Sequence, residues 1–510
     1  MVATLIAGDS KRDGASIQER ALRGVSALGA FGLGEGDVVA IMLRNEPAFL
    51  EAMLIARLAG CYSCPVNWHY KADEAGYILR DCRAKALIIH ADLLRQIEGG
   101  VPDSCRVVVV EPSVATRAAF RLTPEQSALP PGATEWEAWL AAAAPYEGPP
   151  RKIHGSIPYS SGTTGRPKGV LRAPPQDPTH YARMVEISQA ALGIKQGMRT
   201  AIVAPLYHSA PASYGMQSLL FADLALIHER FDPERLLADI ERHRLDRLYL
   251  VPTHFVRLLR LPDEVKRRYD VSSIAFVAST GSPCPPDVKK AMIDWWGPVI
   301  NESYASSEAG FITFLSAEEA RTHPGSAGRP LMGADVRILN EAGEVCPPFE
   351  PGLIYCRQSA YPDFTYINRD ADRQAIDRGG LVAVGDVGYF DRDGYLYICD
   401  RKSDMVISGG VNIYPAEIEA VLITMPGVAD CAVFGIPDAE FGEALAAHVQ
   451  PVDSTPLDRE GVRAFLRARI ADYKVPRVVE FSEALPREES GKIFKRRLRD
   501  PYWKDAGRRI

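Results

Sequence analysis

The sequence predicts an α/β protein with a large N-terminal domain, made of two α/β halves plus a small β-barrel, and a small mobile α+β C-terminal domain. Three observations support this prediction. Apolar strands alternate with amphipathic helices in two blocks, before and after about residue 150. Short β segments separated by Gly, Asp and Pro turns follow from about residue 325, and a compact unit of helices and strands follows from about residue 400. Alternating strands and helices are typical of a parallel sheet covered by helices on both faces.

The first block forms one predicted α/β half. Its apolar spacing predicts helices at 15–30, 47–58 and 73–82, and strands at 37–43, 86–89 and 106–110. Residues 113–150 break this rhythm, because they are rich in Ala and Pro and end in Gly148-Pro149-Pro150. We expect them to form a surface connection, followed by a short strand at 155–159.

The second block forms the other half. It predicts helices from about 179 and at 212–221, 233–243 and 287–295, and strands at 200–204, 224–227, 247–250, 274–278 and 299–303. The β segments expected in the small barrel lie at 335–339, 352–357 and 389–398, the last being a hairpin with Asp-Gly at its turn. The last unit predicts helices at 415–424 and 459–470 and strands at 428–434, 444–449 and 477–481. We expect the two domains at residues 1–401 and 402–510.

The composition is that of an ordinary globular protein. The 510 residues are 46% hydrophobic and 24% charged, with a net charge of −6, so no general attraction to nucleic acid or to anionic membrane is expected. The first 13 residues do not resemble a secretory signal, and no apolar run approaches the length of a membrane span. The nine cysteines, with Cys61 and Cys64 as the close pair, lack the spacing of a zinc site. We therefore expect reduced thiols in a cytoplasmic protein.

The most distinctive stretch is Tyr159-Ser160-Ser161-Gly162-Thr163-Thr164-Gly165-Arg166-Pro167-Lys168-Gly169-Val170. Glycine lets the backbone turn tightly, and consecutive N–H groups together with Ser and Thr hydroxyls can cradle phosphate oxygens. Lys168 adds a point charge that suits a polyphosphate. The order Pro-Lys-Gly is not that of the P-loop. The composition alone also fits a flexible surface loop, so the rest of the chain has to decide between the two interpretations.

Two further candidate segments follow predicted strands of the second half. Tyr304, Ser307 and Glu308 come just after the strand at 299–303, at the rim of an open sheet where ligands bind. Glu308 suits Mg²⁺ as an oxygen ligand, and Tyr304 suits stacking on a purine ring. In isolation, such residues are more often simple surface residues. Gly281 and Ser282 follow the strand at 274–278, where a tight turn into the next helix explains them equally well.

A third group surrounds the predicted domain boundary. Asp386 lies between two glycines and suits the hydroxyls of a ribose, and the planar donors of Arg401 suit a phosphate. A turn aspartate is the alternative for Asp386. Gly409 and Gly410 belong to a connection between a strand and a helix. Lys492 begins a basic stretch that also fits a basic tail or a nucleic-acid patch.

Along the chain, the segments resemble, in the same order, the signature motifs of the adenylate-forming superfamily, which includes acyl-CoA synthetases, firefly luciferase and the adenylation domains of peptide synthetases. The resemblance covers about residues 17–499. The chain departs from the family pattern at Ala305 and Ser307, which replace Gly and Thr. It also has Ser403 at the family's hinge position, which is often Asp or Lys.

The resemblance implies a role for each group. Lys492 is implied as the adenylation lysine, Glu308 as the Mg²⁺ ligand, and Thr163 as a further catalytic residue of the phosphate loop. His208 is implied at the boundary between the carboxylate and the acyl pocket, although a lone His after a strand is more often structural. The implied binding residues for ATP and CoA are Ser160, Ser161, Gly162, Thr164, Gly165, Lys168, Gly281, Ser282, Tyr304, Ser307, Asp386, Arg401, Gly409 and Gly410. The expected wall of the acyl pocket contains Tyr214, Gly215, Val251 and Thr253.

The implied activity is that of an ATP-dependent acyl-CoA synthetase, an acid–thiol ligase that forms an acyl-adenylate with ATP and Mg²⁺ and passes the acyl group to CoA. Residues 207–211 and 251–253 look like those of fatty-acyl and bile-acid-type ligases, so the expected substrate is a medium- or long-chain fatty, steroidal or other bulky apolar acid. The alternatives are a stand-alone adenylation enzyme that loads an external carrier protein, a luciferase-like oxidase, and a catalytically silent nucleotide-binding protein. The oligomeric state stays open, a homodimer included.

Overall fold

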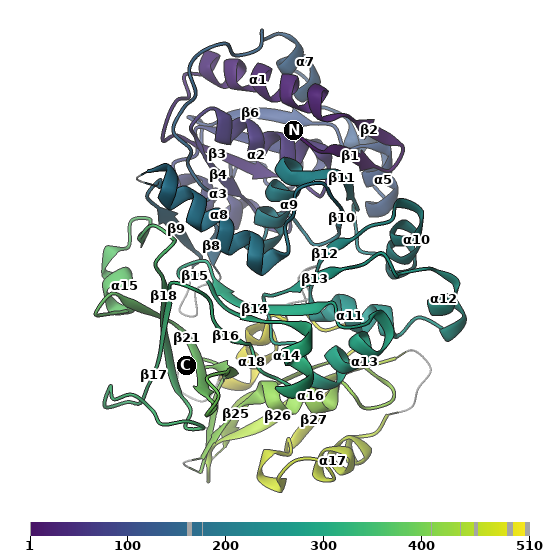
Figure 1. Ribbon diagram of the computed structural model, residues 1–510, viewed down its shortest axis with the longest axis vertical. Coiled ribbons are helices and arrows are strands. Elements are labelled where there is room, and N and C mark those ends of the chain that lie inside the picture. Colours follow the sequence, from purple (N-terminus) through teal and green to yellow (C-terminus); the bar gives the residue numbers. More distant parts are fainter. Residues whose placement is uncertain are drawn as a thin grey trace.

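The computed structural model describes residues 2–160, 166–175, 177–409, 411–438, 440–452, 457–486 and 493–504. A large N-terminal domain is joined at one end to a small C-terminal domain (Figure 1). This arrangement of mixed α and β elements confirms the predicted fold class. None of the helices in the described ranges is long and apolar enough to cross a membrane.

The first half is a five-stranded parallel sheet in the order β4-β3-β5-β6-β7. Its strands are β3 (Val38–Met42), β4 (Tyr62–Pro65), β5 (Ala86–His90), β6 (Arg106–Val110) and β7 (Thr134–Glu135). Its main helices are α1 (Gly14–Ala30), α2 (Pro47–Leu58), α3 (Ala72–Asp81) and α4 (Ala91–Gln96). Val39 and Ile41 pack in one core with α1 and α2, whereas Ala40 and Met42 pack in another with α3. The central strand is therefore apolar on both faces, as expected for a parallel sheet between helix layers.

The expectation that residues 113–150 form a surface connection is wrong. This segment contains α5 (Val114–Phe120), α6 (Pro124–Ser127), β7 and α7 (Trp136–Ala141). β7 extends the parallel sheet by pairing with β6. Trp136 is 1% exposed and packs into the same core as α1 and α2. The sequence did not predict these elements, because each is too short to show a clear apolar pattern in an Ala- and Pro-rich segment.

The second half is a nine-stranded mixed sheet in the order β16-β15-β14-β13-β12-β10-β11-β1-β2. Its parallel strands are β1 (Thr4–Ala7), β10 (Met198–Ile202), β11 (Ala222–Ile227), β12 (Arg247–Leu250), β13 (Phe276–Ser279) and β14 (Ile300–Ser306). Antiparallel strands at its two edges are β2 (Ser10–Arg12), β15 (Gly310–Leu315) and β16 (Arg329–Pro330). The helices of this half are α8 (Pro178–Leu192), α9 (Ser209–Phe221), α10 (Pro233–His243), α11 (Pro252–Leu259), α12 (Asp263–Arg268), α13 (Pro286–Trp296) and α14 (Ala317–Thr322).

The region predicted to form the small barrel is a five-stranded antiparallel sheet. Its strands are β17 (Ala334–Leu339), β18 (Gly352–Gln358), β20 (Asp377–Arg378), β21 (Leu381–Phe390) and β22 (Leu396–Arg401). The predicted hairpin is the β21–β22 pair, and Gly394 in its turn has a φ of +80° that favours glycine. A separate small sheet joins β8 (Tyr159–Ser160), β9 (Lys168–Arg172) and β19 (Phe364–Tyr366), with α15 (Asp370–Ala375) beside it.

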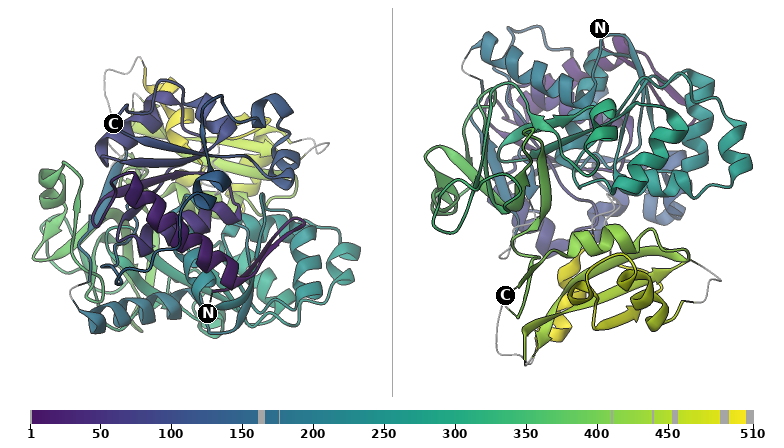
Figure 2. Two further views of the ribbon diagram at one scale, coloured as in Figure 1. Left: turned by 90° about the horizontal axis from the view of Figure 1, so that it is seen from above. Right: turned by 60° about the horizontal axis from the view of Figure 1, so that its bottom comes forward.

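The C-terminal domain is an α+β unit with its own core, as predicted (Figure 2). Its strands are β23 (Val406–Ser408), β24 (Val411–Ile413), β25 (Val428–Asp438), β26 (Gly442–Pro451) and β27 (Val478–Phe481). Its helices are α16 (Pro415–Leu422), α17 (Arg459–Arg467), a 3₁₀ turn (Asp472–Lys474) and α18 (Lys495–Trp503). Ile418 of α16, Val449 of β26 and Leu466 of α17 meet in this core.

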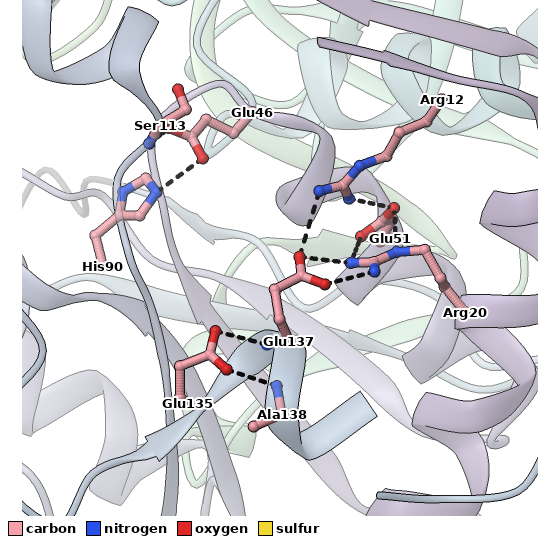
Figure 3. Close-up of polar contacts among 9 residues, drawn as sticks. All are labelled: Arg12, Arg20, Glu46, Glu51, His90, Ser113, Glu135, Glu137 and Ala138. Carbon is pink, nitrogen blue, oxygen red and sulfur yellow. Dashed lines mark hydrogen bonds and ion pairs between the residues drawn. The ribbon is translucent and has the colours of Figure 1, made fainter. Parts of the chain in front are cut away.

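Charged side chains join elements of the first half to one another and to β2 at the edge of the second half's sheet (Figure 3). Glu51 of α2, whose side chain is 0% exposed, accepts hydrogen bonds from Arg12 Nη1 (2.6 Å) and Arg20 Nε (3.0 Å). Glu137 of α7 accepts from the same two arginines. Burial alone would lower the pKa of Arg20, but the hydrogen bonds and charges of Glu137 and Glu51 raise it above its ordinary value. The four side chains therefore connect β2, α1, α2 and α7.

A second buried carboxylate in Figure 3 lies just after β3. Glu46 Oε1 accepts from the backbone N–H of Ser113 (2.9 Å), and its Oε2 lies 3.4 Å from His90 Nε2. Burial alone would raise the pKa of Glu46, but the charge and hydrogen bond of His90, together with bonds from Thr116 and Ser113, lower it to about 2. This carboxylate therefore connects the ends of β3 and β5 to α5.

Candidate active site

A cavity of about 2580 Å³ lies between the N-terminal and C-terminal domains. The carboxyl ends of the parallel strands β10, β12, β13 and β14 open into it. Residues from these ends that line it are Pro205, Val251, Gly281 and Tyr304. Because ligands of open α/β sheets bind at this edge, the cavity lies where the sequence predicts the site.

The predicted phosphate-binding stretch is the turn of a hairpin. β8 and β9 pair antiparallel, with Tyr159 opposite Gly169 and Ser160 opposite Lys168. A Cβ at Gly169 would lie 2.7 Å from the ring of Tyr159, so the close approach of these strands requires glycine. The predicted residues Ser161, Gly162, Thr163, Thr164 and Gly165 lie outside the described residues, and so does the side chain of Ser160.

Lys168 and Glu308 meet at one tyrosine. The Nζ of Lys168 lies 5.1 Å from the centre of the Tyr366 ring and 2.9 Å from Asp372 Oδ2. The hydroxyl of Tyr366 donates to Glu308 Oε1 (2.9 Å). Burial and the charge of Glu308 raise the pKa of Tyr366, so this hydroxyl remains a donor. A cation and a carboxylate thus share one wall of the cavity.

Arg172 holds the turn that carries Glu308. Its Nη2 donates to the carbonyl oxygens of Ser307 (2.8 Å) and Glu308 (2.5 Å), and its Nη1 donates to that of Pro362 (2.6 Å). Burial lowers the pKa of Arg172 to about 10, so its side chain is cationic at neutral pH. The predicted Ser307 therefore contacts this arginine through its backbone.

Tyr304, Asp386 and Arg401 form a row at the cavity wall. The hydroxyl of Tyr304 donates to Asp386 Oδ2 (2.6 Å), and Arg401 Nε lies 3.4 Å from Asp386 Oδ1. Asp386 and Arg401 face each other across β21 and β22, so Asp386 is a strand residue and not a turn aspartate. Tyr304 lies inside β14, and not after the strand as predicted, because pairing with β15 extends β14 to Ser306. Burial and Asp386 raise the pKa of Tyr304.

Gly281 and Ser282 form an exposed turn after β13 and line the cavity. The φ of Gly281 is +95°, a conformation that favours glycine. The segment after this turn is fixed from behind, because Glu302 accepts from the backbone N–H of Cys284 (3.3 Å) and forms a buried ion pair with Lys289. The turn is thus held by the interior of the second half.

His208 precedes α9 and lines the cavity. The segment before it is held by Asn45, which belongs to the first half. The Asn45 side chain donates to the carbonyl oxygen of Ala204 (3.0 Å) and accepts from the backbone N–H of Leu206 (2.9 Å). The packing of the two halves therefore positions His208.

Two of the four residues predicted to form the wall of the acyl pocket line the cavity, and two do not. Val251 and Thr253 line the cavity. Tyr214 does not, because it is 1% exposed and its hydroxyl lies 2.7 Å from Thr200 Oγ1. Gly215 also points into the core, where an added Cβ would lie 2.7 Å from Leu206. Residues three and four apart share a helix face, and in the body of α9 the face toward the cavity includes Ser213, Met216, Gln217 and Leu220.

The connection between the domains contains Ser403, the predicted hinge. The carbonyl oxygen of Ser403 accepts from Arg499 of α18 (3.2 Å). Asp400 Oδ2 accepts from the backbone N–H of Ala416 at the start of α16 (2.9 Å). Burial raises the pKa of Asp400. These hydrogen bonds attach the predicted hinge residue, and Asp400 before it, to the C-terminal domain.

Lys492 and Gly410 lie outside the part of the chain that the structure describes. Ile493, the residue after Lys492, lines the cavity, whereas Gly409 does not. Gly409 has a φ of +57° and donates its backbone N–H to the carbonyl oxygen of Phe441 (2.9 Å). The neighbour of Lys492 therefore reaches the cavity in this arrangement, whereas Gly409 does not.

Some residues that shape the site carry no sequence signal. Arg172 lies four positions after Lys168 on β9, and no motif marks it. Tyr366 and Asp372 lie in a stretch for which the sequence predicts no element, and the pairing of β19 with β9 brings Tyr366 beside the phosphate-loop hairpin. Gln217 was missed because the predicted wall residues Tyr214 and Gly215 lie on the face of α9 that points into the core.

Within the described ranges, one group of side chains has a geometry suited to a metal ion. His323, Asp391 and Asp393 offer ligand atoms within 4.8 Å of one another. None of the three lines the cavity. Asp391 already accepts from the backbone N–H groups of Asp393 and Tyr395, as a turn aspartate does.

Comparisons with known proteins agree with this geometry. The family model described as AMP-binding enzyme matches residues 5–361, and the model of the AMP-binding enzyme C-terminal domain matches residues 417–492. The chain is 32% identical to 2-succinylbenzoate–CoA ligase of Bacillus licheniformis, over 97% of the chain and 96% of that protein. It is 34% identical to a CoA ligase of Mycobacterium tuberculosis named for a methyl-dioxo-octahydroindenyl propanoyl group, over 97% of the chain and 95% of that protein. The structure of o-succinylbenzoate CoA synthetase from Bacillus subtilis, in complex with its acyl-adenylate, has a TM-score of 0.78 at 28% identity and covers 98% of this chain and 95% of that one.

Proposed function

The chain belongs to the AMP-binding enzyme family, and from this premise we propose that it is an ATP-dependent acyl- or aryl-CoA ligase that acts through an acyl-adenylate. Both relatives named above are CoA ligases, and each is matched along nearly its whole length. Such an acid–thiol ligase converts ATP to AMP and pyrophosphate.

One observation supports this proposal most strongly. Lys168, Glu308, Asp386 and Arg401 come from four segments of the chain, and all four line the same cavity. Asp386 offers oxygens to the ribose hydroxyls, and the planar donors of Arg401 suit a phosphate. Lys168 supplies a point charge for a polyphosphate. Together these side chains suit the ribose and the phosphates of one ATP molecule.

The proposed reaction has two steps. First, a carboxylate oxygen of the acid attacks the α-phosphorus of ATP, the bond to the β-phosphate oxygen breaks, and pyrophosphate leaves. Then the CoA sulfur attacks the acyl carbon, the thiol gives up its proton, and AMP leaves with the electrons of the broken C–O bond. The contribution of the protein is mainly positioning and neutralisation of charge. Lys492 is the proposed adenylation lysine, and Ser403 the proposed hinge between the steps.

Mg²⁺ is the metal implied by this chemistry, and Glu308 fits it. Hard cations prefer carboxylate oxygens, and Glu308 lines the cavity on the same wall as Lys168. Tyr366 orients the carboxylate through Oε1, and Arg172 holds its backbone. When bound, the metal would offset negative charge on the phosphates of ATP.

We propose that the acid is bulky, with a mainly apolar body such as a fatty, aryl or steroidal one. The acyl side of the cavity is walled by Met184 and Val185 of α8 and by Met216, Leu220 and Phe221 of α9. Burying apolar substrate surface against such a wall contributes about 25 cal/mol per Å². The bicyclic propanoyl group in the name of the mycobacterial relative is an acid of this kind.

A pyrophosphate-release assay tests the proposal. The purified chain is incubated with ATP, Mg²⁺ and a panel of short, long-chain, aryl and steroidal acids, with and without CoA. We expect acid-dependent pyrophosphate release, and an acyl-CoA product when CoA is present. Asp386→Asn should raise the KM for ATP, whereas Asp335→Asn, an exposed aspartate of β17 outside the cavity, should not.

Other outcomes separate the alternatives. ATP binding without pyrophosphate release for any acid would support the nucleotide-binding protein and contradict the ligase. Release that transfers the acyl group to carrier phosphopantetheine but not to CoA would support the carrier-loading enzyme. Light emission with a luciferin would support the luciferase-like oxidase.

A further inference from the structure

The acyl side of the cavity is built from the facing sides of two helices. Residues at helical spacing line it, and they are Tyr181, Met184, Val185 and Ser188 on α8 and Ser213, Met216, Gln217 and Leu220 on α9. Most of this wall is apolar, as a fatty or aryl body requires. The exception is a small polar patch formed by Ser188, Ser213 and Gln217, where the two helices meet.

Gln217 is the centre of this polar patch. Its Nε2 donates to Ser188 Oγ (2.6 Å) and to Ser213 Oγ (3.2 Å). Its Oε1 is buried and has no hydrogen-bond partner among the described residues. An amide has two donors and an acceptor with two lone pairs. If the amide is turned over, the oxygen faces the serines and the NH₂ group is left unsatisfied. In either orientation, one end of the amide lacks a partner.

A buried amide end without a partner costs free energy in the empty protein. A ligand that brings a hydrogen-bonding atom to this position recovers that cost, whereas an apolar ligand seals the unpaired group away from water. Such a site discriminates against the analogue that lacks the hydrogen-bonding atom, because that analogue leaves the buried polar group of the protein unpaired. The polar patch is therefore suited to selection among acids, and not only to general burial.

The neighbours of the amide indicate the charge of the matching group. Ser188 and Ser213 are uncharged, and Ser188 is also hydrogen-bonded to Tyr361. The pKa of Tyr361 is raised to about 12 by burial, so its hydroxyl is neutral at physiological pH. A neutral oxygen that accepts or donates a hydrogen bond fits this patch.

We propose that Gln217 is a specificity-determining residue that binds a neutral hydroxyl or keto oxygen on the body of the acid, at a distance from its carboxylate. This inference rests on the proposed function, because it concerns the acyl end of the same cavity. The preferred substrate is then an oxygenated bulky acid, and not a plain hydrocarbon chain. A hydroxyl satisfies the amide in both of its orientations, and a keto oxygen satisfies it when the NH₂ group faces the cavity.

The test uses pairs of acids of equal skeleton, one with and one without a hydroxyl or keto oxygen, such as hydroxylated and plain arylpropanoates and oxo- and deoxo-steroidal acids. Pyrophosphate release gives kcat/KM for each acid. We expect the wild-type chain to prefer the best oxygenated member about 10- to 100-fold over its plain partner. In Gln217→Leu, that ratio should fall to near 1, while the KM for ATP stays in the wild-type range.

The matched control is Gln189→Leu, the same change on α8 at a residue outside the cavity lining. It should keep the wild-type ratio. A thermal melting curve shows whether each variant is folded. An unchanged ratio in folded Gln217→Leu, or a wild-type preference for the plain acid of every pair, would overturn the inference.

Binding measured by calorimetry separates this inference from the proposed function. Each acid of a pair is titrated into the full chain saturated with a non-hydrolysable ATP analogue. If no acid supports pyrophosphate release but the oxygenated acids still bind more tightly, and Gln217→Leu removes the difference, the site assignment stands and the ligase proposal fails. Equal binding of both members in the wild-type chain contradicts the site assignment, whatever the activity.

Discussion

At the scale of single residues, Arg172 supports the site from within the protein. Its side chain donates hydrogen bonds to three backbone carbonyl oxygens, so it acts as a bracket for the turn that carries Glu308. A planar guanidinium can reach three acceptors at fixed angles, which an ammonium group cannot do. The position of Glu308 therefore depends on a residue with no place in any sequence motif.

Arg172→Leu should destabilise the chain by roughly 2–4 kcal/mol, because buried carbonyl oxygens lose their donors. It should also lower kcat for pyrophosphate release more than it raises the KM for the acid, because Glu308 is displaced. Urea unfolding and the pyrophosphate assay measure these effects. Arg337→Leu, at an exposed arginine paired with Asp335, should change the stability by less than about 0.5 kcal/mol. Equal effects of the two changes would contradict the bracket role.

Glu46 gives a pH-dependent prediction. The pKa of its carboxyl group is lowered to about 2 in the folded chain, from an ordinary value of 4.5. A lowered pKa contributes stability that is present above about pH 4.5 and is lost as the pH falls toward 2. We therefore expect Glu46→Gln to cost up to about 3 kcal/mol at pH 7, with a smaller cost below pH 4.

Unfolding free energies of the wild type and Glu46→Gln between pH 7 and pH 3 test this expectation. Glu318→Gln, at an exposed glutamate of α14, is the control and should behave as wild type. A cost for Glu46→Gln that stays constant down to pH 3 would show that the carboxylate charge does not matter.

The sequence predicts many of the residues that line the cavity, but not the residues that hold them in position. Lys168, Glu308, Asp386 and Arg401 belong to recognisable motifs, and the structure brings them to one cavity. Their roles in binding and catalysis stay predictions. The role of Tyr366 could not be predicted from the sequence. Tyr366 lies between Lys168 and Glu308 only because β19 pairs with β9, a strand far from it in the chain.

At the scale of elements, the arginine–glutamate group of Figure 3 explains how short pieces are held to the first half. Glu51 and Glu137 share Arg12 and Arg20, which come from β2 and α1. Removing one member of a buried ion pair leaves uncompensated charge. The stability of α7, too short to persist alone, thus depends on side chains from β2 and α1.

Glu51→Ala should therefore destabilise the protein by roughly 3–5 kcal/mol. Asp294→Ala, which breaks the exposed Lys290–Asp294 pair on α13, should cost less than about 1 kcal/mol. Chemical denaturation compares the two. A cost for Glu51→Ala no larger than that of the control would mean that solvent screens the group.

Element boundaries show where local patterns stop being informative. Apolar patterns located α1, α2 and α10 within a residue or so, because each of these helices runs for several turns. It did not find β1, which owes its place to a parallel pairing with β11 more than 200 residues away, as the register Thr4 to Leu224 shows. Pairing partners at such separations leave no trace in the local sequence.

At the scale of the whole molecule, the domains are arranged with α16 and the beginning of α18 at the cavity. Asp400 is bonded to Ala416, and Arg260 of the second half donates to the carbonyl oxygen of Val428 (2.8 Å). Ile493 lines the cavity and Gly409 does not. Under the proposed function, this is the arrangement expected for adenylation, because it brings the neighbour of Lys492 to the ATP side.

Lys492→Ala should reduce adenylation by about 10²–10³-fold, an effect of the size seen when one donor to a developing charge is removed. It should spare thioester formation from supplied acyl-adenylate, because that step belongs to the other arrangement. Acid-dependent pyrophosphate release and CoA acylation from synthetic acyl-adenylate measure the two halves separately. Equal losses in both halves would refute the division of labour.

The end of β22 connects the proposed hinge to the proposed nucleotide site. Arg401 is the last residue of that strand and touches Asp386, and Ser403 follows two positions later. A swivel that starts at Ser403 pulls on the strand whose final side chain meets the proposed ribose partner. Binding of the nucleotide then shifts the orientation of the C-terminal domain, and that orientation shifts nucleotide affinity by the same coupling free energy. Under the proposed function, departure of AMP resets the protein for the next molecule of ATP.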